Sequence, residues 1–416
     1  MVKPGYKKTE IGVIPEDWEV VCWEDVLSGF TSGATPYRGN PEYYDGTIKW
    51  VASGELKYNT IFDTLEHISE EARAKTNLTI HPAGTFLMAI TGLEAAGTRG
   101  SCALLGTEAT TNQSCMAIYG TDKLDIKYLY HYYVSNGDKL AFQYCQGTKQ
   151  QSYTAAIVKK LPILLPPFSE QQHISEALSD MDELIASLEK IITKKKSIKQ
   201  GTMQELLTGK RRLPGFSEAW KTVCLSEIGH FIKGAGISRA DANTGKLPAV
   251  RYGELYTKHD FYIKEYYSHI SPQIAEKATP VSYGCILFAA SGETKEEIGK
   301  CAAVIDHGTV YAGGDTLVFF PAEPIDPVFL GSLLNAPQVA AQKAQRGQGD
   351  AIVHIHADSL SEIVITIPNY EEQSAIAAFL LSADGEIDSL MNKLVKARQI
   401  KQGMMQQLLT GKIRLS

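Results

Sequence analysis

Two long segments of the chain repeat apolar residues at alternating steps of four and three positions. The first series is Ile174, Leu178, Met181, Ile185, Leu188 and Ile192. The second series is Ile376, Leu380, Ala383, Ile387, Leu390, Leu394 and Ala397. This spacing is typical of a coiled-coil seam. A long helix with so narrow an apolar face needs a partner, so we predict that the two helices bury their seams against each other, antiparallel, within one chain.

The residues that flank the first series predict where its helix begins and ends. Pro166-Pro167 precede it, and Ser169 with Gln172 forms a capping-box pattern, so Ser169 is the predicted N-cap. Gly209 is predicted to end the helix, because glycine readily takes the left-handed conformation that follows a last turn. About 40 residues at about 1.5 Å each give a helix of about 60 Å. The second helix is predicted to begin after Pro368.

The remaining sequence carries shorter apolar runs that glycines bound. Such runs are typical of buried strands, and they occupy residues 84–90, 284–290, 302–305 and 316–320. Helical stretches are predicted at 128–134 and 327–334. The predicted class is therefore mixed α/β. His354 and His356 are placed by this pattern on one face of a strand, but a third metal ligand is not evident beside them.

The sequence contains an internal repeat of two copies. Glu170-Gln171 recurs as Glu372-Gln373, and Leu206-Leu207-Thr208-Gly209-Lys210 recurs as Leu408-Leu409-Thr410-Gly411-Lys412. Upstream, Trp18 and Cys22 match Trp220 and Cys224, and Gly54-Glu55-Leu56 matches Gly253-Glu254-Leu255. Two copies are too few for a solenoid. The pattern indicates two pseudo-symmetric halves, suited to a protein that touches two similar places at once.

Composition adds limits to this interpretation. The 416 residues are 44% hydrophobic and 21% charged, as in an ordinary globular protein of two or three domains. The net charge of −6 argues mildly against a dedicated nucleic-acid binder. Basic residues cluster, however: residues 189–212 hold eight Lys/Arg and two Glu, and residues 393–416 hold six Lys/Arg and no acid. A solvated helix face is the simplest interpretation of such a run, and recurrence at the same place in both copies counts against it.

Several functional classes receive no support. No apolar run reaches the roughly 18 residues of a membrane span, and the N-terminus lacks an apolar signal region, so a cytoplasmic protein is expected. The seven cysteines include no C-x-x-C pair, which disfavours zinc and disulfide frameworks. Leu165-Pro166-Pro167-Phe168 superficially resembles an amino-methyltransferase motif, but its leucine cannot accept a hydrogen bond from a target amine. A phosphate-binding G-x-x-x-x-G-K-[ST] is absent.

A specific family combines these features. A mixed α/β part, a P-x-x-x-E-Q segment, a long amphipathic helix and Leu-Leu-Thr-Gly-Lys-x-x-Leu, all repeated once, resemble the specificity subunit of type I restriction-modification systems. The match rests on Pro166 with Glu170-Gln171, on Pro368 with Glu372-Gln373, and on 204–213 and 406–415. The Pro15-Glu16-Asp17-Trp18 opening is a further family-like feature.

The resemblance implies an organisation and a function. Residues 1–165 and 211–367 would be target recognition domains, and residues 166–210 and 368–416 would be spacer helices. Each recognition domain would read one half of a split sequence in double-stranded DNA. The helices would fix the spacing of the half-sites and dock two methyltransferase subunits, and restriction subunits through these. The chain itself would be non-catalytic, with no metal or cofactor.

Polar and basic loops that differ between the two copies are the candidate DNA contacts, because lysine and arginine bind phosphate or guanine and glutamine binds adenine. In the first copy they are Thr91, Arg99, Lys149, Gln150, Gln151 and Tyr153. In the second copy they are Arg251, Tyr252, Ser291, Lys295, Arg346 and Gln348. Two alternatives stay open. The globular parts could hold an unrecognised active site, or the protein could be a scaffold that assembles partner proteins through its coiled coil and binds no DNA.

Overall fold

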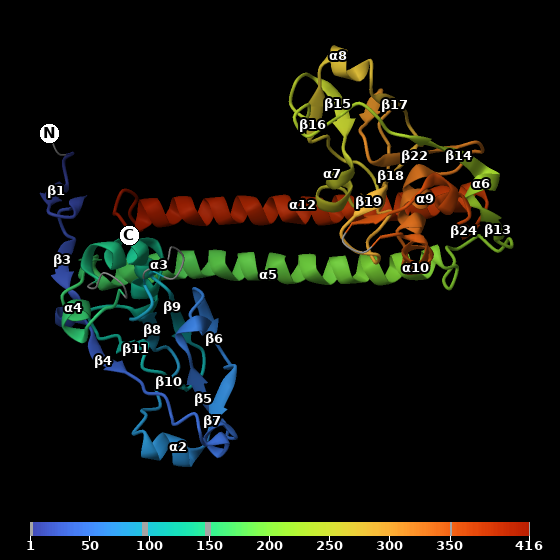
Figure 1. Cartoon of the computed structure of the whole chain (residues 1–416). Helices are drawn as coiled ribbons and strands as arrows, with labels where there is room; N and C mark the ends of the chain where they lie inside the picture. Colours follow the sequence, from blue (N-terminus) through green and yellow to red (C-terminus); the bar gives the residue numbers. More distant parts are fainter. Residues whose placement is uncertain (1–2, 94–98, 146–150, 350–351, 416) are drawn as a thin grey trace. The chain divides into compact units, whose positions relative to one another are not determined.

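The computed structural model describes residues 3–93, 99–145, 151–349 and 352–415. Two long helices dominate it: α5 (Phe168–Leu207) and α12 (Tyr370–Leu408), drawn green and red in Figure 1. The chain forms two compact units. Unit 1 is Met1–Glu189 with Lys393–Ser416, and unit 2 is Lys190–Asn392. Each unit therefore contains one globular part, one end of α5 and one end of α12.

In unit 1, two sheets carry the globular part. The first is five-stranded, in the order β4-β11-β8-β9-β6, and the second is three-stranded, in the order β10-β5-β7. The strands of the first are β4 (Ser28–Ser32), β11 (Cys115–Tyr119), β8 (Phe86–Ala89), β9 (Cys102–Leu105) and β6 (Asn59–Ile61). Those of the second are β10 (Thr110–Thr111), β5 (Ile48–Val51) and β7 (Glu66–Ile68). Every residue of the central β8 is buried, which explains its unbroken apolar sequence.

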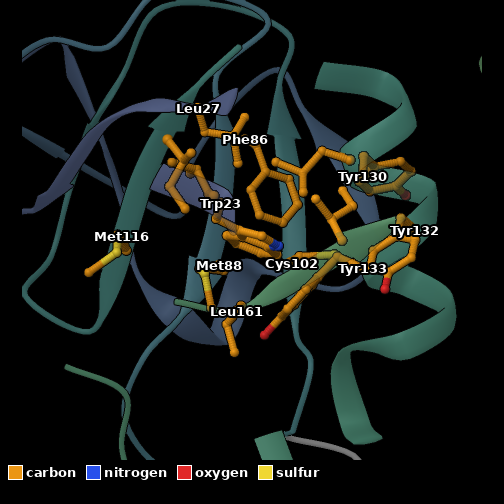
Figure 2. Close-up of a cluster of buried hydrophobic side chains, with 14 of the residues drawn as sticks. Trp23, Leu27, Phe86, Met88, Cys102, Met116, Tyr130, Tyr132, Tyr133 and Leu161 are labelled. Atoms are coloured by element: carbon orange, nitrogen blue, oxygen red, sulfur yellow. The ribbon is translucent and has the colours of Figure 1, made fainter. Parts of the chain in front are cut away.

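Smaller elements complete unit 1. A hairpin joins β1 (Tyr6–Thr9) to β2 (Gly12–Pro15), and β3 (Glu19–Cys22) pairs antiparallel with β12 (Pro162–Leu165). The other helices of unit 1 are α1 (Trp23–Val26), α2 (Glu70–Lys75), α3 (Ile126–Tyr144) and α4 (Ala155–Lys159), with 3-10 turns η1 (Pro41–Tyr44) and η2 (Ser53–Glu55). Figure 2 shows the core where these elements meet. Trp23, Phe86 and Tyr133 lie edge to face there, with ring centroids 5.6 to 6.4 Å apart.

Unit 2 repeats this plan. Its sheets are four-stranded, in the orders β14-β22-β18-β20 and β16-β15-β21-β17. The first contains β14 (Gly229–Lys233), β22 (Thr316–Pro321), β18 (Ile286–Ala289) and β20 (Cys301–Ala303). The second contains β16 (Ser268–Ile270), β15 (Leu247–Val250), β21 (Val310–Ala312) and β17 (Thr279–Val281). Two short pairs join β13 (Lys221–Cys224) to β24 (Val364–Ile367) and β19 (Ser291–Gly292) to β23 (Val353–His354).

The helices of unit 2 differ from those of unit 1 most clearly where unit 1 has α3. They are α6 (Leu225–Ile228), α7 (Tyr252–Thr257), α8 (Pro272–Ala275), α9 (Pro327–Leu334), α10 (Pro337–Arg346) and α11 (Ala357–Ser361). Where unit 1 has the single 19-residue α3, unit 2 has α9 and α10 in succession. Pro337 explains the break, because proline is compatible with a first helical turn and incompatible with a helix interior.

The predicted pairing of the long helices is confirmed within each unit. In unit 1, Asp182 and Glu189 of α5 pair with Lys401 and Arg398 of α12 at 2.5 and 2.6 Å. In unit 2, Lys195 and Lys199 of α5 pair with Glu386 and Asp384 of α12 at 2.7 and 2.6 Å. The partner number falls as the α5 number rises, so the helices are antiparallel. None of the predicted seam residues is exposed.

Most local predictions agree with the structure, and two are wrong. The four apolar runs each overlap a strand, and both predicted helical stretches are helical. Gly209 has the predicted left-handed φ of 68°. Ser169, however, lies inside α5, which begins at Phe168, so it is not the N-cap. His356 is the N-cap of α11 and lies outside β23, so it does not share a strand face with His354.

The cysteines and the helices carry two further observations. All seven cysteines are free, and Cys102, Cys115, Cys285 and Cys301 are buried among apolar side chains. In the part of the chain that the structure describes, every helix is too short or too polar to cross a membrane.

Candidate nucleic-acid interface

A buried glutamate lies at the start of each long helix and binds an arginine from a distant part of the chain. In unit 1, Glu170 is 4% exposed and accepts hydrogen bonds from Trp18 Nε1 at 3.0 Å and from Arg414 Nε at 2.6 Å. Arg414 also pairs with Asp17, and this hydrogen bond lowers the pKa of Asp17. The C-terminal segment is thereby fixed to the globular part of unit 1.

Unit 2 contains the matching arrangement. Glu372 is 1% exposed and accepts hydrogen bonds from Trp220 Nε1 at 3.2 Å and from Arg212 Nε at 2.6 Å. Arg212 follows Leu-Leu-Thr-Gly-Lys of the first copy, as Arg414 follows that of the second. Each repeated segment therefore fastens the end of one long helix to the beginning of the other. The two repeated motifs serve one structural purpose.

The glutamine after each glutamate fixes the helix to its own globular part. Gln171 accepts from the Asp125 amide at 2.9 Å and donates to the Pro166 carbonyl at 2.9 Å. Gln373 accepts from the Asp326 amide at 3.1 Å and donates to the Pro368 carbonyl at 2.9 Å. Asp125 and Asp326 in turn cap α3 and α9. These buried amides orient each long helix relative to the sheets beside it.

A hollow of about 770 Å³ opens in unit 2 beside the repeated Gly-Glu-Leu segment, and we name it the Arg251 hollow. Its basic and aromatic lining residues are Arg239, Arg251, Tyr252, Lys258 and Tyr267. The acidic side chains that also line it are Glu254 and Asp315. Glu254 is 5% exposed and binds Arg251, so its charge is matched inside the wall. Cations, aromatic rings and the exposed Asp315 carboxylate therefore face the opening.

Unit 1 has a smaller hollow, of about 370 Å³, at the corresponding Gly-Glu-Leu segment. We name it the Ser53 hollow. Its lining includes Ser53, Lys57, Tyr58 and the predicted Thr91. The position that matches Arg251 is Ala52, so this hollow has no guanidinium at that place. The shared framework thus presents different side chains in the two copies.

The other residues predicted in the first copy have different surroundings. Arg99 lies 3.7 Å from Asp138 and stacks over the Phe142 ring. Gln151 is partly buried, and its carbonyl accepts from the Leu93 amide. Tyr153 is 3% exposed and packs in the core, where burial raises its pKa. We therefore leave Tyr153 out of the proposed interface. Lys149 and Gln150 lie outside the described residues.

The residues predicted in the second copy divide between the hollow and its surroundings. Arg251 and Tyr252 line the Arg251 hollow. Ser291 is buried and hydrogen-bonds to His354 Nδ1 at 2.9 Å. Arg346 donates to the Gln342 carbonyl, and Gln348 exchanges main-chain hydrogen bonds with His354. Lys295 and Gln348 are exposed. The structure does not bring these four residues into the hollow.

Among the basic and aromatic residues that line the Arg251 hollow, sequence reasoning missed three: Arg239, Lys258 and Tyr267. Lys258 follows Gly253-Glu254-Leu255 closely, so the basic residue after that repeated segment was an available signal. Arg239 and Tyr267 come from segments remote in sequence, and only the fold brings them to the same opening.

Comparison with known proteins identifies the family. A family model described as the type I restriction modification DNA specificity domain matches residues 15–200 and again residues 217–397. The chain is 24% identical over 417 residues to the type I restriction enzyme MjaVIII specificity subunit of Methanocaldococcus jannaschii, covering 97% of this chain and 94% of that protein. It is 26% identical over 434 residues to the putative MjaX specificity subunit of the same organism, covering 99% and 97%.

The fold is also shared with a solved structure. A crystal structure of the S subunit of a type I restriction-modification system from M. genitalium superposes with a TM-score of 0.61 at 14% identity, covering 94% of this chain and 96% of that chain. The family model covers most of the chain in two consecutive stretches, which coincide with the internal duplication. The chain belongs to the family of type I restriction-modification DNA specificity subunits.

Proposed function

We propose that this protein reads a split, asymmetric target in double-stranded DNA, one half-site with each globular part. The observation that carries the proposal is a repeated framework whose exposed side chains differ. Arg251-Tyr252 stands in the second copy where the first has Ala52-Ser53, beside the same Gly-Glu-Leu. Like frames that present unlike side chains suit a target whose two halves differ in sequence. Base contacts specify a sequence, and phosphate contacts position the protein on it.

We propose that the long helices set the distance between the half-sites and dock two methyltransferase subunits, with restriction subunits joining through these. α5 and α12 are each continuous from one unit into the other. α5 also carries exposed apolar residues outside its seam: Leu184 is 47% exposed, Ile191 40% and Ile198 51%. They lie one heptad apart and therefore share a helix face. A methyltransferase subunit is the occupant that we propose for this face.

We propose that the chain supplies recognition and that its partners supply the chemistry. The sequence contains neither the acid-or-amide, Pro, Pro, aromatic motif of amino-methyltransferases nor an ATP-binding phosphate loop. Extrusion of a target base into an active site would then occur in the methyltransferase subunit.

The experiment that tests this function measures binding of duplex DNA to the purified complex of this chain with its methyltransferase subunit. The expected result is binding that weakens steeply with salt, because each phosphate contact releases a counterion and contributes about −0.9 to the slope of log K against log salt. A well-formed complex that shows no salt-sensitive DNA binding would favour the scaffold alternative. The chain alone serves as a control for how much of the binding the partner contributes.

A further inference from the structure

The Arg251 hollow contains one arginine that is held more rigidly than its neighbours. Arg251 Nε donates to Ser268 Oγ at 2.9 Å, and Nη2 donates to Glu254 Oε1 at 3.0 Å. Ser268 and Glu254 are 0% and 5% exposed, so both partners are buried. Ser268 Oγ also donates to Glu254 Oε1, which completes a closed triangle of hydrogen bonds. The guanidinium plane is therefore set by the core of unit 2.

The backbone supports the same arrangement. Arg251 is the N-cap of α7, and its amide donates to Glu254 Oε2 at 3.1 Å. One carboxylate thus holds both the main chain and the side chain of Arg251. A side chain tied at both places loses little further freedom when it binds a ligand. The side chain is nonetheless 28% exposed and lines the hollow.

The hydrogen bonds that Arg251 makes leave one edge of its guanidinium free to bind a ligand. Nε and Nη2 form the edge that faces Ser268 and Glu254. Among the described residues, Nη1 has no hydrogen-bond partner. The Nη1–Nη2 fork therefore remains for a ligand. Such a fork matches the O6 and N7 acceptors of guanine, which is the commonest specific contact between arginine and a DNA base.

The position of Arg251 favours a base over a phosphate. Arg239 and Lys258 are exposed, and the Lys258 ammonium lies over the Tyr267 ring. Flexible, exposed cations are suited to the DNA backbone, because phosphate contacts carry no sequence information and tolerate movement. A recessed arginine with buried supports is suited to a base edge, because discrimination requires fixed geometry. The hollow thus combines one arginine held by buried partners with two exposed cations.

We propose that Arg251 reads one guanine in the half-site recognised by unit 2, that Glu254 and Ser268 orient it, and that Arg239 and Lys258 bind the neighbouring phosphates. The proposal rests on the DNA-reading function proposed above and deepens it. Unit 1 is expected to read its half-site differently, because Ala52 occupies the matching position. Within the described part of unit 1, the matching carboxylate, Glu55, accepts hydrogen bonds from the backbone amides of Ala52 and Leu65 and from no side chain.

The test maps methylated adenines in a host that expresses the methyltransferase subunit with the wild-type chain or with Arg251→Ala. The wild-type map is expected to show an invariant guanine in one half-site. Arg251→Ala is expected to reduce discrimination at that guanine about 5- to 150-fold and to leave the other half-site unchanged. As a matched control, Arg239→Ala with Lys258→Ala is expected to weaken DNA binding and reduce its salt dependence without changing the motif.

A probe in the DNA tests the contact in the wild-type protein, where folding of a variant plays no part. The wild-type complex is titrated with a synthetic duplex that carries 7-deazaguanine in place of the guanine assigned to Arg251. This base lacks the N7 acceptor. Weaker binding by the wild type, with no such loss for Arg251→Ala, which has no donor to N7, supports the assignment. A split motif that lacks the guanine, or a guanine that Arg251→Ala and 7-deazaguanine leave unaffected, overturns it while the proposed function stands. Absence of any methylation motif from an intact complex overturns both.

Discussion

Arg414, the third-last residue of the sequence, donates from Nε to Oε1 of the buried Glu170 at 2.6 Å, across a sequence separation of 244 residues. Arg212 makes the equivalent bond to Glu372 at 2.6 Å in unit 2. The last segment of the chain thus completes unit 1 in the way that the segment between the two copies completes unit 2. In each unit, the arginine–glutamate pair holds the segment after one long helix against the beginning of the other.

Removal of the arginine should weaken unit 1. Arg414→Ala leaves Glu170 buried with fewer donors, and the expected loss of unfolding free energy is about 2–4 kcal/mol. Arg212→Ala should act in the same direction on unit 2. The control is Arg398→Ala, which breaks an exposed pair with Glu189 and should cost no more than about 1 kcal/mol. Denaturant midpoints check this, and equal effects of Arg414→Ala and Arg398→Ala would refute it.

A buried histidine makes the stability of unit 1 depend on pH. Burial, with Lys401 and Lys127 nearby, lowers the pKa of His131 to about 3. The unfolded chain takes up a proton below about pH 6.5, and the folded chain does not. The contribution of His131 to the free energy of unfolding is therefore complete above about pH 6.5. It declines as the pH falls toward 3, by at most about 1.4 kcal/mol per pH unit.

Urea midpoints at pH 7, 6 and 5 measure this effect. His131→Gln should show a smaller fall than the wild type between pH 7 and 5, because glutamine has no proton to gain. His307→Gln, at an exposed position beside Tyr283, should keep the wild-type pH dependence. Parallel losses in the wild type and His131→Gln would show that other groups dominate this range.

The exposed apolar face of α5 is expected to carry the partner. Ile191→Asp places a charge in the middle of the Leu184, Ile191 and Ile198 face and should weaken methyltransferase binding at least about 10-fold. The helix content should stay the same, since Ile191 is outside the seam. Ser197→Asp, an exposed change on a different face of the same helix, is the matched control. Co-purification and titration with the methyltransferase subunit measure both, and undiminished binding by Ile191→Asp would move the docking surface elsewhere.

The lengths of the helices should set the gap in the target. Removal of residues 187–193 and 389–395 deletes one heptad from each helix and preserves the register of both seams. Seven residues at about 1.5 Å each are about 10 Å, or about 3 base pairs of B-DNA. The half-sites should stay unchanged while the gap between them shortens by about that amount. A changed half-site sequence with an unaltered gap would contradict this prediction.

The sequence predicted what depends on local periodicity. The seam residues, the strands at 84–90 and 284–290, and the left-handed Gly209 all follow from spacing or from the conformational range of one residue. The capping-box pattern suggested Ser169 as the N-cap, which is wrong. The Gln171 amide already donates to the Pro167 carbonyl, so the helix begins before Ser169. An error of this size is inherent where two adjacent residues can both precede a helix.

The candidate site was less accessible from the sequence, for a physical reason. Arg251 was predicted from its difference from Ala52, but its supports include Ser268, which only the pairing of β15 with β16 brings beside it. Tyr153 ends a polar loop, and such a tyrosine suits a DNA surface as well as a core. In the fold, the Tyr153 amide donates to the Ile90 carbonyl, and the Tyr153 ring is buried in the core.

The most direct measurement of the central claim is a genome-wide map of methylated adenines in a host that expresses this chain with the methyltransferase subunit of its own operon. The account predicts a single split motif with two unlike halves and a fixed gap. A continuous motif, or no methylation despite a stable purified complex, would contradict the claim that the two units each read half of a DNA target.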